Sequence, residues 1–339
     1  MKKISWLFLI LLVLLFALFF VFPKFFVGVP VPKLDTVAYD KKLNELANNP
    51  IPKEGIILTN LWPVQTVYPN AGAILPFKRI VAYYGNLYST KMGVLGQYPE
   101  AEMLAKLDTE VKKWETADPS TPVVPALHYI AVVAQTNAGE DGKYRVRMPD
   151  SEIDKVLEMA AKIPARPGGG NAIVFLDLQV GFSTLESELP KLERYFKLPN
   201  VHLGVDAEFS MKHGIRPGKV VGTFDAADIN FATNYLAKIV RENDLPPKIL
   251  IVHRYTQKML TNYQAIAPLP EVEIVMHMDG WGEMAKKIST YKSFIYPEPV
   301  QFTGFKLFYK NDVLQPGTTL MTPADLLKLQ PRPIYIQYQ

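Results

Sequence analysis

The 339 residues, 48% hydrophobic and 21% charged, have the balance of a globular protein with a sizeable core, in one large α/β domain or two ordinary ones. The net charge of +4 is only mildly basic, and no long basic run is interleaved with aromatic residues, so we expect no nucleic acid partner. The absence of cysteine excludes disulfide bonds, thiolate metal sites, a cysteine nucleophile and the lipid-bearing cysteine of a bacterial lipoprotein.

The N-terminal segment is the most apolar part of the chain. After Lys2 and Lys3, residues 4–22 are apolar apart from Ser5. A helix over this range is about 28 Å long, enough to cross a bilayer core of about 30 Å. The bulky residues at 19–26 offer no small-x-small cleavage site. We therefore expect residues 1–24 to be an uncleaved transmembrane signal anchor in the cell membrane, with an extracytoplasmic C-terminal domain; a buried core helix is the alternative.

Residues 25–76 are rich in proline and contain one helical candidate at residues 39–47. This composition is typical of a spacer and not of a separate domain. We expect the spacer to pack on the domain that follows, over residues 77–339.

From residue 77 onward, strand-like and helix-like runs alternate, which is the pattern of an α/β fold. The expected strands cover residues 79–85, 123–134, 172–181, 202–209, 220–225, 248–255, 273–279 and 302–309. The expected helices cover residues 100–116, 151–162, 183–196, 227–243, 257–266 and 282–290. This alternation predicts a (β/α)8 TIM barrel. The alternative is a doubly wound open sheet, but no G-x-G-x-x-G follows any of these strands.

Polar side chains gather toward the C-terminal ends of seven of these strands. In a TIM barrel, those ends and the loops after them form the catalytic face. The set therefore indicates a ligand-binding or catalytic face, although each residue taken alone is equally typical of a satisfied polar group at a barrel rim. The candidates are Tyr84, His128, Asp177, Gln179, Asp206, Glu208, Asp225, His253, Arg254, His277 and Asp279.

Two carboxylates close the run Val201–Ser210. If the strand continues through both, Asp206 and Glu208 share one face, about 7 Å apart along the backbone. Like charges held so close are costly without partners or a function, and glycosidases use pairs of carboxylates. Glu208, beside Phe209, is expected to have a raised pKa and to act as general acid. Asp206 would orient a substrate amide, share a proton or act as the second carboxylate; the alternative is that both residues cap the next segment or pair with basic side chains.

The remaining candidates complete this hypothesis. Asp279, expected on the seventh strand across the barrel, is a candidate nucleophile or base, and Asp177 is a further catalytic candidate. Tyr84, Tyr255 and Trp281 offer stacking surfaces for sugar rings, or serve in packing. The expected substrate-binding set is Tyr84, His128, Gln179, Asp225, His253, Arg254, Tyr255, His277 and Trp281.

The segment Gly204-Val205-Asp206-Ala207-Glu208 resembles the Asp-x-Glu motif of barrel glycosidases, including chitinase-like and some lysozyme-like families. That resemblance implies that Glu208 is the proton donor and that Asp206 assists the substrate N-acetyl group. Val201 and Gly204 stand where the chitinase motif has two further Asp residues. The combination of Y-Y-G-N, G-V-L-G, D-L-Q-V-G, V-D-A-E, I-V-H-R-Y and H-M-D-G-W-G is similar to an uncharacterised exported bacterial TIM-barrel family.

Three functions follow from these residues. The favoured one is a membrane-anchored glycoside hydrolase that binds a cell-envelope polysaccharide and uses no cofactor. The second is a non-catalytic envelope binding or scaffold protein. The third is a metal-dependent hydrolase, since the histidines and carboxylates are possible ligands. Because no H-x-x-x-H or H-E-x-x-H occurs, we expect no metal site.

Overall fold

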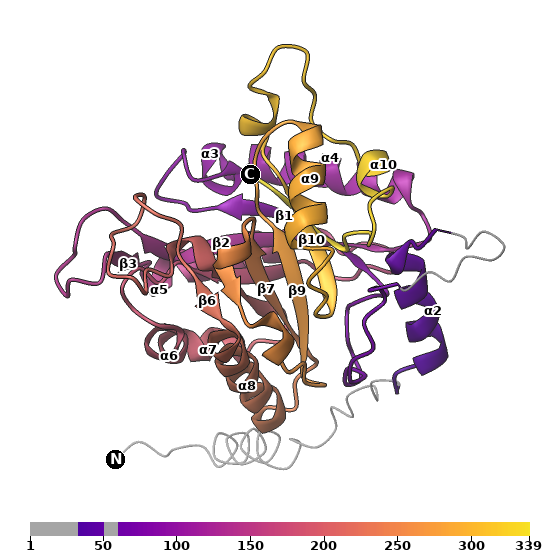
Figure 1. The fold of residues 1–339 in the computed structure, drawn as a ribbon, viewed down its shortest axis with the longest axis horizontal. Coiled ribbons are helices and arrows are strands. Elements are labelled where there is room, and N and C mark those ends of the chain that lie inside the picture. Colours follow the sequence, from indigo (N-terminus) through magenta and orange to yellow (C-terminus); the bar gives the residue numbers. More distant parts are fainter. Residues whose placement is uncertain (1–32, 51–59) are drawn as a thin grey trace, which may run out of the picture. The chain divides into compact units, whose positions relative to one another are not determined.

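Parallel strands close into a barrel in the computed structural model, which describes residues 33–50 and 60–339 (Figure 1). A nine-stranded sheet contains one antiparallel strand, β3 (Arg145–Arg147), which leaves eight parallel strands. Strand β1 pairs with both β2 and β11, which closes the ring and confirms the predicted TIM barrel. In barrel order the strands are β1 (Arg79–Gly85), β2 (Val123–Ala134), β4 (Ile173–Leu178), β5 (Val201–Asp206), β7 (Lys248–Arg254), β9 (Val272–Met278), β10 (Phe302–Leu307) and β11 (Tyr335–Tyr338).

Helices cover the outside of the barrel. Every residue of the eight strands except Ala134 is buried, as expected for a parallel sheet with both faces covered. The longer helices are α4 (Glu100–Ala117), α5 (Asp150–Ala161), α8 (Ala226–Glu242) and α9 (Met284–Phe294). The short ones are α3 (Val94–Gln97), α6 (Leu185–Glu188), α7 (Glu193–Phe196) and α10 (Pro323–Leu326). Single 3-10 turns are η1 (Leu189–Leu192), η2 (Ala207–Phe209), η3 (Gln257–Met259), η4 (Tyr263–Ala265) and η5 (Asn311–Val313).

The inner face of the barrel changes from apolar to polar along each strand. Ile80 and Ala82 on β1 and Phe175 on β4 belong to one buried apolar cluster. Because side chains alternate faces with period 2, the next inward residues are Tyr84 on β1 and Asp177 on β4. The C-terminal half of the barrel interior is therefore lined by polar groups, which is where the site forms.

The segment before β1 contacts the N-terminal end of the barrel. Helix α2 (Thr36–Ala47) places Tyr39 and Leu43 in the same apolar cluster as the barrel interior. The carboxylate of Glu273 accepts hydrogen bonds from the backbone N–H groups of Ile74 (3.1 Å) and Leu75 (2.8 Å). These contacts hold residues around 74–75 against the barrel.

The predicted transmembrane anchor, residues 1–24, lies outside the described residues. Within residues 33–50 and 60–339, no helix combines the length and the apolar character that spanning a bilayer requires. The division into anchor, spacer and barrel domain stays a prediction.

Two expected elements differ from the structure, and one strand of the structure was not expected. The strand expected at 220–225 is only β6 (Phe224–Asp225), which pairs with β8 (Leu260–Thr261) apart from the barrel. Val220 and Val221 are each 40% exposed, so of this run's large apolar residues only Phe224 reaches the core. The closing strand is β11, which was not predicted. The helix expected at 257–266 is wrong, because η3, β8 and η4 occupy that range.

Candidate active site

A cavity of about 530 Å³ opens at the C-terminal ends of the barrel strands. Its volume is in the range of sites that hold small molecules. Seven of the residues expected at the site line it: Tyr84, Gln179, Asp206, Glu208, Tyr255, Asp279 and Trp281. Strand ends far apart in sequence thus meet at one place, as the barrel prediction requires.

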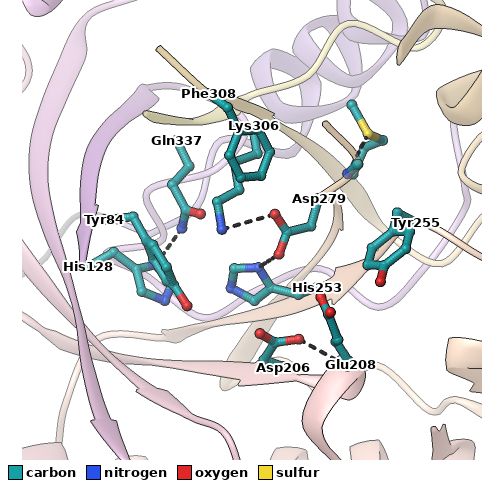
Figure 2. Close-up of polar contacts among 12 residues, drawn as sticks. Tyr84, His128, Asp206, Glu208, His253, Tyr255, Asp279, Lys306, Phe308 and Gln337 are labelled. Atoms are coloured by element: carbon teal, nitrogen blue, oxygen red, sulfur yellow. Dashed lines mark hydrogen bonds and ion pairs between the residues drawn. The ribbon is translucent and has the colours of Figure 1, made fainter. Parts of the chain in front are cut away.

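Asp206 and Glu208 both face the cavity, but not as neighbours on one strand face. Strand β5 ends at Asp206, and the chain turns into η2, which contains Glu208. The Asp206 carboxylate accepts a hydrogen bond from the backbone N–H of Glu208 at 3.0 Å (Figure 2). The expected shared strand face is therefore wrong, and Asp206 has the capping role that was the alternative.

The pKa of both carboxyl groups is raised. Burial raises the pKa of Asp206 well above its usual value, against the opposing positive charge of His253. Burial also raises the pKa of Glu208, and the negative charge of Asp279 adds to the effect. Glu208 is half-buried while Asp206 is only 3% exposed. Glu208 is therefore the better placed of the two to give a proton to a ligand in the cavity.

Asp279 lies between two basic groups. Its Oδ1 is 2.9 Å from Lys306 Nζ and its Oδ2 is 2.9 Å from His253 Nδ1 (Figure 2). Burial opposes ionisation, but the positive charge of Lys306 and the hydrogen bond from His253 outweigh it and hold the pKa of Asp279 below its usual range. The same cavity therefore holds one carboxyl group with a lowered pKa, Asp279, beside two with a raised pKa, Asp206 and Glu208.

Asp279 was expected on the seventh strand of the barrel, and this expectation is wrong. It follows β9, the sixth strand of the barrel, which is separated from β5 only by β7. The strand number expected for Asp279 was too high by one because residues 220–225 do not form a barrel strand. Glu208 and Asp279 consequently lie on neighbouring parts of the rim, as Figure 2 shows, and not on opposite sides.

Aromatic and basic side chains complete the wall. Trp281 is 50% exposed, and the Nζ of Lys286 lies 4.5 Å from the centre of its ring. Tyr255 lies beside Glu208 (Figure 2), and the Nζ of Lys306 lies 3.8 Å from the centre of the Tyr84 ring. Sequence reasoning missed Lys306. The signal for it was its position within the strand expected at 302–309, followed two residues later by Phe308, which also lines the cavity.

A second layer of polar groups lies beneath the cavity. Asp177, His128, His253 and His277 are fully buried in the barrel interior, outside the described residues that line the cavity. The Oδ2 of Asp177 accepts a hydrogen bond from the Tyr84 hydroxyl at 3.1 Å. None of these four residues lines the cavity among the described residues, and their expected roles in catalysis or substrate binding stay predictions.

Two expected residues belong elsewhere. Asp225 caps α8, with its carboxylate accepting from Ala227 N–H and from the side chains of Thr261 and Asn262. Arg254 alternates with the inward-facing His253 on β7 and forms a buried ion pair with Glu298. Both were expected at the mouth because each ends an expected strand, but neither lines the cavity in the part of the chain that the structure describes.

The fold and the site define a class: a (β/α)8 barrel with an acidic, aromatic-lined cavity at its C-terminal face. No protein-family model matches the chain, and no curated protein matches it. Among solved structures, it is similar to "Cellulase Cel5C_n", with a TM-score of 0.36, 13% identity and coverage of 67% of this chain and 65% of the cellulase. It is also similar to "a ruminal GH26 endo-beta-1,4-mannanase", with a TM-score of 0.32, 12% identity and coverage of 77% and 58%. The chain spans less than two thirds of either protein.

Proposed function

We propose that this protein is a glycoside hydrolase of the cell envelope, with Glu208 as general acid. One observation supports the proposal above all others: a single cavity holds Glu208, the ion-paired Asp279 and the exposed ring of Trp281. Glycosidases need a protonated carboxyl group and an ionised carboxylate on either side of the scissile bond. Sugar rings also need flat apolar surfaces, which the aromatic wall supplies.

The proposed reaction divides the roles between two side chains. Glu208 gives its proton to the glycosidic oxygen as the bond from that oxygen to the anomeric carbon breaks. Asp279 stabilises the positive charge that develops on the sugar, and either attacks the anomeric carbon or takes a proton from the attacking water. The water molecule restores both carboxyl groups, and the products are two shorter glycans. Lys306 and His253 hold Asp279 in place through its two oxygens.

Asp206 supports Glu208 from the floor of the cavity. Its carboxyl group accepts the backbone N–H of Glu208 at 3.0 Å, which fixes the turn that carries the acid. Gln179 is 3.4 Å from the other oxygen of Asp206 and 3.3 Å from the Tyr84 hydroxyl. This chain of contacts holds the floor of the cavity in one arrangement.

The experiment compares Glu208→Gln with a matched control, Glu283→Gln, on purified cell-wall polysaccharide. Glu283 is exposed, precedes α9 and does not line the cavity within the described residues. We expect release of reducing ends by the wild type and the control, and a loss of about 10²–10⁴-fold in Glu208→Gln. Equal release by all three proteins would remove Glu208 from the mechanism. Binding of the polysaccharide without any release would favour the non-catalytic envelope binding protein.

The same proposal places the barrel outside the cell, tethered to the lipid bilayer by residues 4–22. The absence of cysteine permits a direct test with one introduced thiol. Glu158 on α5 is exposed, so Glu158→Cys offers an accessible label site. We expect a membrane-impermeant maleimide to label this variant in intact cells. Labelling only after lysis would place the barrel in the cytoplasm instead.

A further inference from the structure

Three potential metal ligands converge in the barrel interior beneath the cavity. The Oδ1 of Asp177 on β4 is 3.3 Å from His128 Nε2 on β2 and 3.4 Å from His253 Nε2 on β7. All three atoms lie within 4.8 Å of one another, and all three side chains are fully buried. Two histidine nitrogens and one carboxylate oxygen form a ligand set that zinc and related ions accept.

None of the three atoms has a hydrogen-bond partner among residues 33–50 and 60–339. Each histidine nitrogen is close enough to Asp177 Oδ1 for an ion pair when the ring is protonated, but neither contact has hydrogen-bond geometry. Buried polar atoms are almost always satisfied, so three unsatisfied atoms facing one point need an explanation. A cation between them satisfies all three at once.

The second polar atom of each of these three side chains, on the side away from the shared point, has a hydrogen-bond partner. His253 Nδ1 is 2.9 Å from the carboxylate of Asp279. His128 Nδ1 is 2.6 Å from the Tyr335 hydroxyl and accepts from the Gln337 side-chain amide at 3.1 Å. The second oxygen of Asp177 accepts from the Tyr84 hydroxyl at 3.1 Å. Metal-bound histidines characteristically donate their other ring N–H to a carboxylate or another oxygen, and the contact of His253 Nδ1 with Asp279 has this form. Figure 2 shows the His253–Asp279 contact.

We propose that His128, Asp177 and His253 bind one divalent first-row transition ion in the barrel interior. Bonds of about 2.0–2.1 Å in a tetrahedral zinc site separate neighbouring ligand atoms by about 3.3–3.4 Å, the two spacings found around Asp177 Oδ1. Gly204 on β5 leaves this point open: a Cβ there would lie 2.4 Å from both Asp177 Oδ1 and His128 Nε2. Any larger residue would fill the space that the ion needs.

The proposed ion goes beyond the proposed hydrolase and does not depend on it. The ion would affect the cavity through His253, whose other ring nitrogen, Nδ1, contacts the carboxylate of Asp279. Binding at Nε2 holds the imidazole in one orientation and thereby holds the carboxylate at the cavity floor. The ion is a positioning element in this account, and no step of the hydrolysis requires it.

Metal binding by the wild-type protein is the first test. The full chain, purified without a polyhistidine tag and stripped with a chelator, is titrated with Zn²⁺ and separately with Co²⁺. We expect one bound ion per chain by elemental analysis, visible absorption bands of Co²⁺ in a tetrahedral N/O site, and a higher thermal unfolding temperature. Absence of stoichiometric binding by the folded wild-type chain overturns the proposal, whatever the variants do.

Two variants then locate the ion. Asp177→Asn removes one ligand charge and keeps a group that accepts from Tyr84, so we expect at least a hundredfold weaker Co²⁺ binding. The matched control is His202→Asn, because His202 is also buried inside the barrel but accepts from the backbone N–H of Ile249 at 3.0 Å. Unchanged Co²⁺ spectra in Asp177→Asn, or loss of binding in His202→Asn alone, contradict the assignment.

Discussion

Lys306 and Asp279 form a buried ion pair on which the arrangement of the cavity floor depends. Their side chains are 3% and 6% exposed, and the Nζ to Oδ1 distance is 2.9 Å. Removing one member of such a pair leaves the other charge uncompensated, which typically costs 3–5 kcal/mol. Since Asp279 keeps His253 as a partner, we expect Lys306→Met to lower the free energy of unfolding by about 3 kcal/mol, the lower end of this range.

A double-mutant cycle separates the interaction free energy of the Lys306–Asp279 pair from the other effects of each substitution. We expect Lys306→Met combined with Asp279→Asn to be more stable than the sum of the two single effects by at least about 1.5 kcal/mol. The assay is equilibrium denaturation in urea, with reversibility checked by refolding. As a surface control, Lys112→Met breaks the exposed Lys112–Asp108 pair and should change stability by less than about 0.5 kcal/mol. If the two single changes in the free energy of unfolding add up to the change in the double variant, the proposed coupling is refuted.

Two further predictions concern the cavity wall and the far end of the barrel. Trp281→Ala should weaken glycan binding by about 1 kcal/mol, roughly fivefold, in a binding titration, whereas Tyr88→Ala, also exposed but away from the cavity lining, should not. Burial raises the pKa of Glu273 to about 8, although the hydrogen bonds from the backbone N–H groups of Ile74 and Leu75 lower it. Because this folded-state pKa lies above the unfolded value of about 4.3, stability should fall as pH rises from about 4.3 to 8. Glu273→Gln should make this slope shallower in urea denaturation measured across that range, and an unchanged slope would exclude a contribution from Glu273.

Much of the fold was predictable because strands buried on both faces read as continuous apolar runs bounded by turn residues. The runs at 79–85, 123–134 and 248–255 correspond closely to β1, β2 and β7. Strand β11 was missed because it has only four residues and follows a stretch interrupted by proline. The run at 220–225 has strand composition, but its valines face solvent, and burial is a tertiary property that composition does not report.

The site was predictable in outline because the strand ends of a parallel barrel meet at one face. That rule brought Asp206, Glu208 and Asp279 to one cavity. It could not tell which side chains lie in the opening and which lie a layer below, as Asp177 does. The grouping of Asp177 with His128 and His253 was hidden for a related reason: its members come from three strands and share no sequence spacing.

The role of Glu208 as proton donor is tested most directly by varying the leaving group of the substrate. The dinitrophenolate of a dinitrophenyl glycoside leaves without protonation, whereas a sugar leaving group in a polysaccharide needs a proton on the bridging oxygen. Glu208→Gln should therefore keep most of the wild-type bond-cleavage rate on a dinitrophenyl glycoside that the wild type accepts, while its rate on the polysaccharide falls by about 10²–10⁴-fold. An equal loss on both substrates, or no loss on either, would contradict Glu208 as the acid.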